Sequence, residues 1–303
     1  MNFQQLIEPF FLLFLGTFLG FLFGKFFHFP SKPFSSAVNF VFMPFLVFSG
    51  LIDRELNMQY LLVFIAYFSF ILLLIFIAFF WSKFFPLEVK ENAIFRLTSV
   101  SSNTGNFGIP LCVALFGSEV IAIIAFIILA NQIMLNIFGV FFISQGKKNI
   151  KKSFLDILKM PVLWAITLSL LIKYFSFNFS SSFFEPIKTI GLTTIPLAIF
   201  TFGLSLSGIE KCNFPLRLFL QSSFLRLILS PLVMLIILKI FNLEKNFSQV
   251  LFVESTVPLA IFTIILADIY SCSPQKASSI VLASTILSIF TISFWLVFIL
   301  PKV

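Results

Sequence analysis

The chain has 303 residues, of which 59% are hydrophobic and only 11% are charged, whereas a soluble globular chain carries about 25% charged residues. This composition excludes an ordinary water-soluble domain and predicts an all-α integral membrane protein. The net charge of +8 does not indicate nucleic-acid binding, because the basic residues lie in short loops between apolar stretches.

Apolar stretches long enough to cross a membrane recur along the whole chain. A hydrocarbon core about 30 Å thick requires around 20 apolar residues per helix. The sequence predicts ten spans, at residues 6–27, 34–52, 60–82, 92–117, 120–144, 155–175, 186–208, 215–241, 247–270 and 277–300. The longest connection is a basic stretch after the fifth span, so we divide the chain into a five-helix repeat (1–145), a cytoplasmic linker (146–159) and a second five-helix repeat (160–303).

The two halves resemble each other at an offset of about 152 residues. This offset aligns MPFLVF at Met43–Phe48 with IPLAIF at Ile195–Phe200, and it aligns Asn103 and Thr104 with Ser255 and Thr256. Because each repeat has an odd number of spans, the second repeat enters the membrane in the opposite orientation. We therefore expect two inverted repeats.

Lysine and arginine fall mainly on one side of the predicted spans, with only six on the other side. Basic loops resist translocation, so the richer side faces the cytoplasm. We expect a multi-pass protein of the cytoplasmic (inner) membrane with both termini outside the cytoplasm.

The fourth span is interrupted by the polar segment TSVSSNTGNFGIPL, at Thr98–Leu111. Glycines loosen the backbone and proline lacks an amide donor, so we expect a helix break around residues 103–110. Irregular backbone at membrane depth must line a cavity or be buried in protein, and a half-helix starting near Gly108 favours an anion at its positive end without a fixed basic residue. The candidate substrate-binding residues of this crossover are Asn103, Thr104, Gly105, Asn106, Gly108 and Pro110.

A second, milder break is expected in the ninth span, where VESTVPLAIF contributes Ser255, Thr256 and Pro258 to the same site. Glu254 is an acidic residue within this span, where charge is costly and normally marks function. It is either a coupling group for protons or another cation, or a structural glutamate that lies near the interface or beside a basic neighbour. Arg226 is the candidate partner.

Arg226 lies in the eighth span, where its side chain either joins Glu254 in a charge relay or snorkels to cytoplasmic water. Asn131, Gln132 and Asn136 lie on one face of the fifth span. They either line the cavity or hydrogen-bond to a neighbouring helix.

Several classes of chemistry have no support in the sequence. The three cysteines, Cys112, Cys212 and Cys272, are far apart, and the single histidine, His28, lies at a predicted membrane edge, so neither a metal site nor a disulfide framework is expected. Nucleotide-binding and hydrolase motifs are missing. We expect a protein that is not an enzyme and binds no cofactor or metal.

The segment SSNTGNFGIPLCVALFG, at Ser101–Gly117, resembles the auxin efflux carrier family of membrane transporters. The resemblance extends to FLLFLGTFLG near the start, to VFMPFLVFSGL in the second span and to KASSIVLASTILSIFTISFWLVF in the last span. It implies ten helices in inverted repeats, a scaffold domain, and a transport domain whose broken helices hold the substrate. It also implies small organic anions as substrates, such as auxin, malate or malonate, and the short linker looks bacterial.

The family motif carries over to Asn103, Gly105, Asn106, Gly108 and Pro110, with Pro258 as the proline of the second break. Glu254 departs from the family pattern and puts a plain anion site in doubt. The sequence therefore predicts a secondary transporter for a small organic anion, and the alternative is a proton- or sodium-coupled permease for another small solute with Glu254 as the coupling group. Lipid is the other expected partner, and a homodimer is left open.

Overall fold

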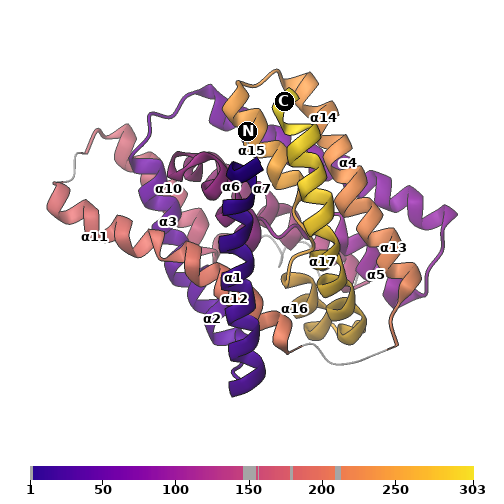
Figure 1. The fold of residues 1–303 in the computed structure, drawn as a ribbon. Coiled ribbons are helices and arrows are strands. Elements are labelled where there is room, and N and C mark those ends of the chain that lie inside the picture. Colours follow the sequence, from indigo (N-terminus) through magenta and orange to yellow (C-terminus); the bar gives the residue numbers. More distant parts are fainter. Residues whose placement is uncertain (1–2, 146–154, 156, 178–179, 209–212) are drawn as a thin grey trace. The chain divides into compact units, whose positions relative to one another are not determined.

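The computed structural model describes residues 3–145, 155, 157–177, 180–208 and 213–303 (Figure 1). The described parts of the chain are helical apart from turns, loops and one isolated β-bridge. Among the described residues are four π-helical turns, in which the helix is locally widened by one residue: η1 (Val38–Phe42), η2 (Thr104–Gly108), η4 (Leu135–Gly139) and η5 (Phe224–Leu229). Three of them connect two α-helices, and η2 follows a non-helical stretch and leads directly into α6.

The chain forms two compact units, and each unit takes segments from both halves of the sequence. Unit 1 comprises Met1–Tyr60, Gly105–Leu129 and Leu158–Gly208, and unit 2 comprises Leu61–Thr104, Ala130–Ile157 and Ile209–Val303. Most of the predicted linker lies outside the described residues.

Unit 1 contains helices from the first, second, sixth and seventh predicted spans, together with parts of the fourth and fifth. Its main elements are α1 (Phe3–Phe27), α2 (Ser31–Ala37), η1, α3 (Met43–Ile52), α6 (Ile109–Phe116), η3 (Ser118–Val120), the first part of α7 (Ile121–Met134), α10 (Pro161–Tyr174), α11 (Ser181–Leu192) and α12 (Thr194–Ser207). Helices α10 and α11 both pack against α3, and α1 runs beside α12 (Figure 1).

The backbones of α1 and α12 touch because glycines face each other across the contact. A Cβ atom at Gly20 would lie 2.1 Å from the carbonyl oxygen of Phe200, and one at Gly203 would lie 1.9 Å from that of Thr17. Small residues allow this close approach between membrane helices, where van der Waals packing replaces the hydrophobic drive available in water.

Unit 2 holds the remaining helices. They are most of α4 (Met58–Phe84), α5 (Val89–Thr98), the end of α7, η4, α8 (Val140–Ile143), α13 (Leu216–Ser223), η5, α14 (Ser230–Phe241), α15 (Lys245–Thr256), α16 (Phe262–Ile269), α17 (Pro274–Phe298) and η6 (Leu300–Lys302). The long helix α17, yellow in Figure 1, contacts α13, α15 and α16.

A hydrogen bond from α17 stabilises the helix that contains η5. Pro231 has no amide hydrogen, so it leaves the carbonyl oxygen of Leu227 without its usual helical donor. The indole Nε1 of Trp295 donates to this oxygen at 2.9 Å. The π-turn that carries Arg226 is thus held from outside its own helix.

Six helices within the described residues are long and apolar enough to cross a membrane: Ser31–Ile52, Met58–Phe84, Ser118–Ile143, Ser182–Ser207, Leu216–Phe241 and Pro274–Phe298. Shorter apolar helices cover Leu13–Phe27, Thr104–Phe116 and Pro161–Tyr174. Many large apolar side chains, such as Phe18, Phe76 and Phe290, are exposed on their surfaces. This pattern is typical of an integral membrane protein, in which lipid covers such side chains.

Candidate functional site

The two expected helix breaks are present in unit 2, and their backbones pair with each other. Helix α5 ends at Thr98 and η2 begins at Thr104, while α15 ends at Thr256 and α16 begins at Phe262. Between these ends, Ser102 and Leu259 form an antiparallel β-bridge. The corresponding hydrogen bonds run from the amide of Asn103 to the carbonyl of Pro258 and from the amide of Ala260 to the carbonyl of Ser101, both at 3.1 Å. Each break therefore satisfies polar groups of the other at a depth where lipid supplies none.

The first break lies earlier than the sequence predicted. The non-helical stretch covers residues 99–103, whereas Gly105, Gly108 and Pro110 lie within η2 and the first turn of α6. Proline is tolerated in a first helical turn, and the adjoining π-turn takes up the flexible glycines. The predicted helix start near Gly108 was therefore wrong, because the helix resumes at Thr104.

The second break is as complete as the first, although we expected it to be milder. Residues 257–261 are non-helical. The helix ends Thr98 and Thr256 are 158 residues apart (256 − 98), and so are the helix starts Thr104 and Phe262 (262 − 104). This spacing differs from the offset of about 152 residues that aligns Asn103 and Thr104 with Ser255 and Thr256, since apolar sequence of low complexity does not define an alignment to within one helical turn.

Side chains close the open C-terminal end of α15. The last carbonyl groups of a helix have no partner within it. Here the hydroxyl of Ser255 donates to Phe252 O at 2.6 Å, that of Thr256 donates to Val253 O at 2.7 Å, and that of Ser230 donates to Ser255 O at 2.7 Å.

Arg226 completes the closure of this helix end and joins it to the first break. Its Nε donates to Val257 O at 3.1 Å, and one terminal nitrogen donates to Glu254 O at 3.3 Å and to the hydroxyl of Ser102. Only 1% of Arg226 is exposed. The snorkelling interpretation was wrong, because the guanidinium is buried and bonds to Val257 O and to the hydroxyl of Ser102.

Glu254 and Tyr67 share the buried surroundings of Arg226. Both residues are fully buried, and Arg226 interacts electrostatically with each of them. Tyr67 was not among the residues predicted from the sequence. Its position in the middle of the apolar third span could have indicated a functional role, since tyrosines of membrane helices usually lie at the interface.

The asparagine of the first break offers a hydrogen-bond donor. Asn103 and Thr104 are both buried, at 3% exposure each. The Nδ2 amide of Asn103 makes no hydrogen bond within the described residues. Because such buried donors are costly to leave unsatisfied, this amide is suited to bind an acceptor such as a carboxylate.

The remaining predicted residues are divided between the two units. Gly105, Asn106, Gly108 and Pro110 belong to unit 1, and Asn131, Gln132 and Asn136 belong to unit 2. The Nδ2 of Asn136 donates to the carbonyl of Gln132 in its own helix at 2.9 Å, and Asn131 is buried. The hydrogen bonds described above for the paired breaks are made by other residues.

A cavity of about 510 Å³ lies within unit 1, between α3, α10 and α11. Its wall is apolar and is formed by Pro44, Phe45, Phe48, Pro161, Trp164, Ala165, Leu168, Ile172, Phe183 and Ile187. A site for a polar solute needs a few convergent polar groups to orient it. This cavity therefore does not fit an organic anion.

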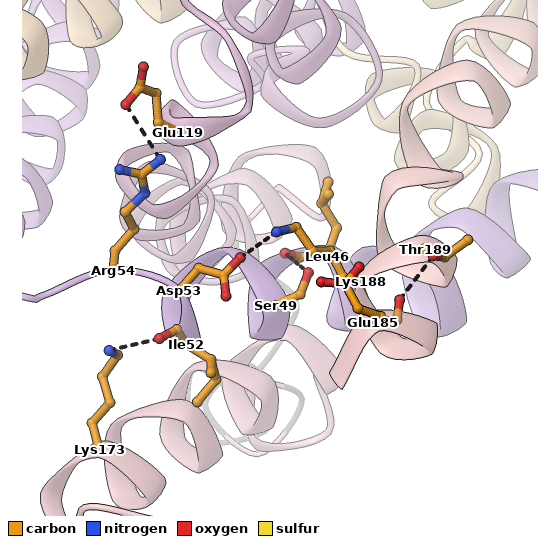
Figure 2. Close-up of polar contacts among 10 residues, drawn as sticks. All are labelled: Leu46, Ser49, Ile52, Asp53, Arg54, Glu119, Lys173, Glu185, Lys188 and Thr189. Atoms are coloured by element: carbon orange, nitrogen blue, oxygen red, sulfur yellow. Dashed lines mark hydrogen bonds and ion pairs between the residues drawn. The ribbon is translucent and has the colours of Figure 1, made fainter. Parts of the chain in front are cut away.

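Figure 2 shows charged residues grouped around the end of α3, in unit 1. Lys188 pairs with Asp53 at 2.8 Å, Arg54 pairs with Glu119 at 3.4 Å, and the Nζ of Lys173 donates to Ile52 O at 3.0 Å. The three basic residues are among the six that the sequence assigned to the outer side. Arg54 follows the end of α3, Lys173 lies in the last turn of α10, and Lys188 lies within α11.

Known proteins that are similar to this chain are membrane transporters, in agreement with the features described above. The model of the membrane transport protein family matches residues 2–156 and 147–296. The chain therefore belongs to this family, which confirms the resemblance to the auxin efflux carriers. It is a multi-pass membrane protein.

Two relatives illustrate the relationship. The chain is 28% identical to the uncharacterized transporter MJ1031 of Methanocaldococcus jannaschii over 215 residues, which is 70% of each chain. It is 25% identical to the uncharacterized transporter YfdV of Escherichia coli K12 over 225 residues, which is 71% of this chain and 70% of the relative.

Proposed function

We propose that this protein is a secondary transporter that carries a small organic anion, such as a dicarboxylate or an auxin-like acid, across the cytoplasmic membrane by alternating access. The observation that carries the proposal is the buried crossing of the two breaks, where the Nδ2 amide of Asn103 donates to none of the described residues and Arg226 supplies a positive charge. Ser255, Thr256 and Pro258 form the other side of this crossing.

Electrostatics supports an anion at this position. A charge inside a protein interacts more strongly than in water, because the surrounding dielectric constant is lower. The guanidinium of Arg226 and the helix that begins beside Asn103 both favour negative charge. The carboxyl group of Glu254 opposes this effect when it is ionised.

Glu254 supports a second candidate function, a permease for another small solute driven by protons or sodium. Its full burial beside Arg226 makes its ionisation state matter to the charge of the crossing. Protonation of Glu254 leaves Arg226 as the nearest unbalanced charge, so binding of a proton and of an anion would favour each other. In this version Glu254 is the coupling group, with Arg226 as its charge partner.

The wider architecture that we propose is a ten-helix protein with two inverted five-helix repeats. In this proposal, unit 1 is the scaffold domain and unit 2, with the paired breaks, belongs to the transport domain. Support comes from the composition of the units, since each combines segments from both halves of the chain. Sequential halves that folded separately would not mix in this way.

We further propose that both termini face outward. Labelling of single cysteines on intact cells with an impermeant maleimide tests this orientation. Glu55→Cys, between α3 and α4, should react from outside, and Gln275→Cys, at the start of α17, should react only after permeabilisation. The reverse pattern would contradict the orientation and leave the carrier function open to its own test.

The carrier function is tested by uptake of labelled malate, malonate and indole acetate into proteoliposomes, with and without pH or sodium gradients. We expect uptake of at least one anion by the wild-type protein and at least a tenfold loss in Asn103→Ala, corresponding to about 1.4 kcal/mol. Asn246→Ala is the matched control, because Asn246 is exposed at the start of α15.

Glu254→Gln separates the two candidates. If the glutamate couples transport to a gradient, this variant transports its solute without gradient dependence. If uptake keeps its full gradient dependence, Glu254 is not the coupling group. Failure to take up any anion under any gradient would contradict the proposed substrate class.

A further inference from the structure

The guanidinium of Arg226 lies among oxygen atoms that come from both breaks. The carbonyls of Glu254 and Val257 belong to the second break, and the hydroxyl of Ser102 belongs to the first. All four residues are buried. Carbonyl and hydroxyl oxygens gathered around a point far from water form a cation site by their chemistry.

The charge balance of the region agrees with this description. The end of α15 carries the negative end of a helix dipole, and Glu254 adds a carboxyl group. Both features favour a positive charge at this point. The guanidinium of Arg226 supplies this positive charge as part of the chain, and arginine stays charged at any physiological pH.

The position of Arg226 is fixed by contacts that do not involve its own side chain. The π-turn η5 contains it, Trp295 donates to Leu227 O at 2.9 Å, and Ser230 donates to Ser255 O at 2.7 Å. A planar guanidinium with several donors can reach two chain segments at once, which the compact ammonium of lysine does less well.

We propose that Arg226 is a positioning residue whose guanidinium acts as a permanently attached cation, holds the two breaks in register, and occupies a site that binds a free guanidinium ion when the side chain is truncated. The inference rests on the proposed function for its relevance to transport, since the register of the breaks sets the position of Asn103. The site itself is defined by the oxygen atoms and does not depend on which solute is carried.

Hydrogen exchange of the bridge amides tests the proposal without any transport assay. In Arg226→Ala, peptides containing Asn103 and Ala260 should lose protection at least tenfold relative to wild type, because their hydrogen bonds pair the breaks. Millimolar guanidinium chloride should restore most of that protection, whereas equal tetramethylammonium chloride should not. Arg217→Ala, which removes an exposed arginine from the neighbouring helix α13, should retain wild-type protection in all conditions.

Two results would overturn the proposal: unchanged protection in Arg226→Ala, or protection that guanidinium does not restore. If Arg226→Ala does not fold, Arg226→Lys provides the measurement, since lysine keeps the positive charge but lacks the planar guanidinium with its several donors. Its bridge amides should exchange faster than those of the wild type, and equal exchange would overturn the proposal. Guanidinium could restore the amide protection of Arg226→Ala even though the wild-type protein takes up no anion. That result would support the positioning role of Arg226 and contradict only the proposed function.

Discussion

The backbone amide of Asn103 donates a hydrogen bond to the carbonyl oxygen of Pro258, with 3.1 Å between nitrogen and oxygen. This bond joins two residues from opposite halves of the chain. Pro258 cannot donate through its own nitrogen, yet its carbonyl remains available as an acceptor. The interrupted helices thus stabilise one another, and the loss of regular structure in each is compensated by the other.

A second link between the breaks is expected to be measurable by a double-mutant cycle. The hydroxyls of Ser101 and Thr263 lie 2.6 Å apart and are buried. Ser101→Ala and Thr263→Val should each lower stability, and the double variant should lose less than their sum, with a coupling of about 0.5–1.5 kcal/mol. Reversible unfolding in detergent provides the measurement, and strictly additive effects would show that the hydroxyl pair contributes no coupling.

The contact between α1 and α12 should not tolerate a side chain at Gly203. Gly203→Val would place atoms against the backbone of Thr17, which no change of rotamer relieves, so we expect a loss of about 2 kcal/mol or more. Gly208→Ala is the control, because a Cβ atom there would lie 4.0 Å from its nearest neighbour, Ser205 O. Thermal unfolding of the purified variants distinguishes them, and equal stability of the two would contradict the close backbone packing.

The bond from Trp295 to Leu227 predicts a compensating pair of substitutions. Trp295→Phe leaves Leu227 O without its donor, and the expected cost is about 1–3 kcal/mol. Pro231→Ala restores an amide at the position that normally bonds this carbonyl. In the Pro231→Ala background, Trp295→Phe should therefore cost clearly less, as measured by thermal unfolding; an unchanged cost would assign the effect to lost ring packing.

Cys272 is expected to react slowly with maleimide at neutral pH. Burial raises the pKa of this thiol, an effect that Lys90 partly offsets, so its thiolate fraction at a given pH is smaller than that of a free cysteine. The labelling rate should consequently rise at a higher pH than usual.

The measurement requires Cys272 as the sole cysteine, in a Cys112→Ala, Cys212→Ala background. An exposed cysteine, introduced as Gln275→Cys with Cys272 also replaced, serves as the reference. Identical rates and pH profiles for the two thiols would contradict the buried position of Cys272.

The sequence predicted the existence of both breaks because proline and clustered polar residues are incompatible with an uninterrupted lipid-facing helix. It predicted the exact start of the first break less well, because η2 and the first turn of α6 accommodate Gly105, Gly108 and Pro110. Local composition shows that a helix is weak. The residue at which the helix gives way to backbone pairing between the breaks depends on the partner segment.

The buried position of Arg226 could not be predicted from the sequence, because it too depends on contacts with distant segments. Its side chain extends from the π-turn η5 to Ser102 and Val257, which are distant from it in the sequence. The β-bridge is likewise a long-range pairing that no periodicity encodes. Tyr67 was missed because aromatic residues in apolar spans are ordinarily packing or interface residues.

The direct backbone contact of α1 with α12 has a mechanical consequence. Packed helices slide past each other by readjusting the rotamers of the side chains between them, and at Gly20 and Gly203 no such layer exists. Relative sliding would bring main-chain atoms into collision, so the two helices are restricted to moving together as one rigid pair.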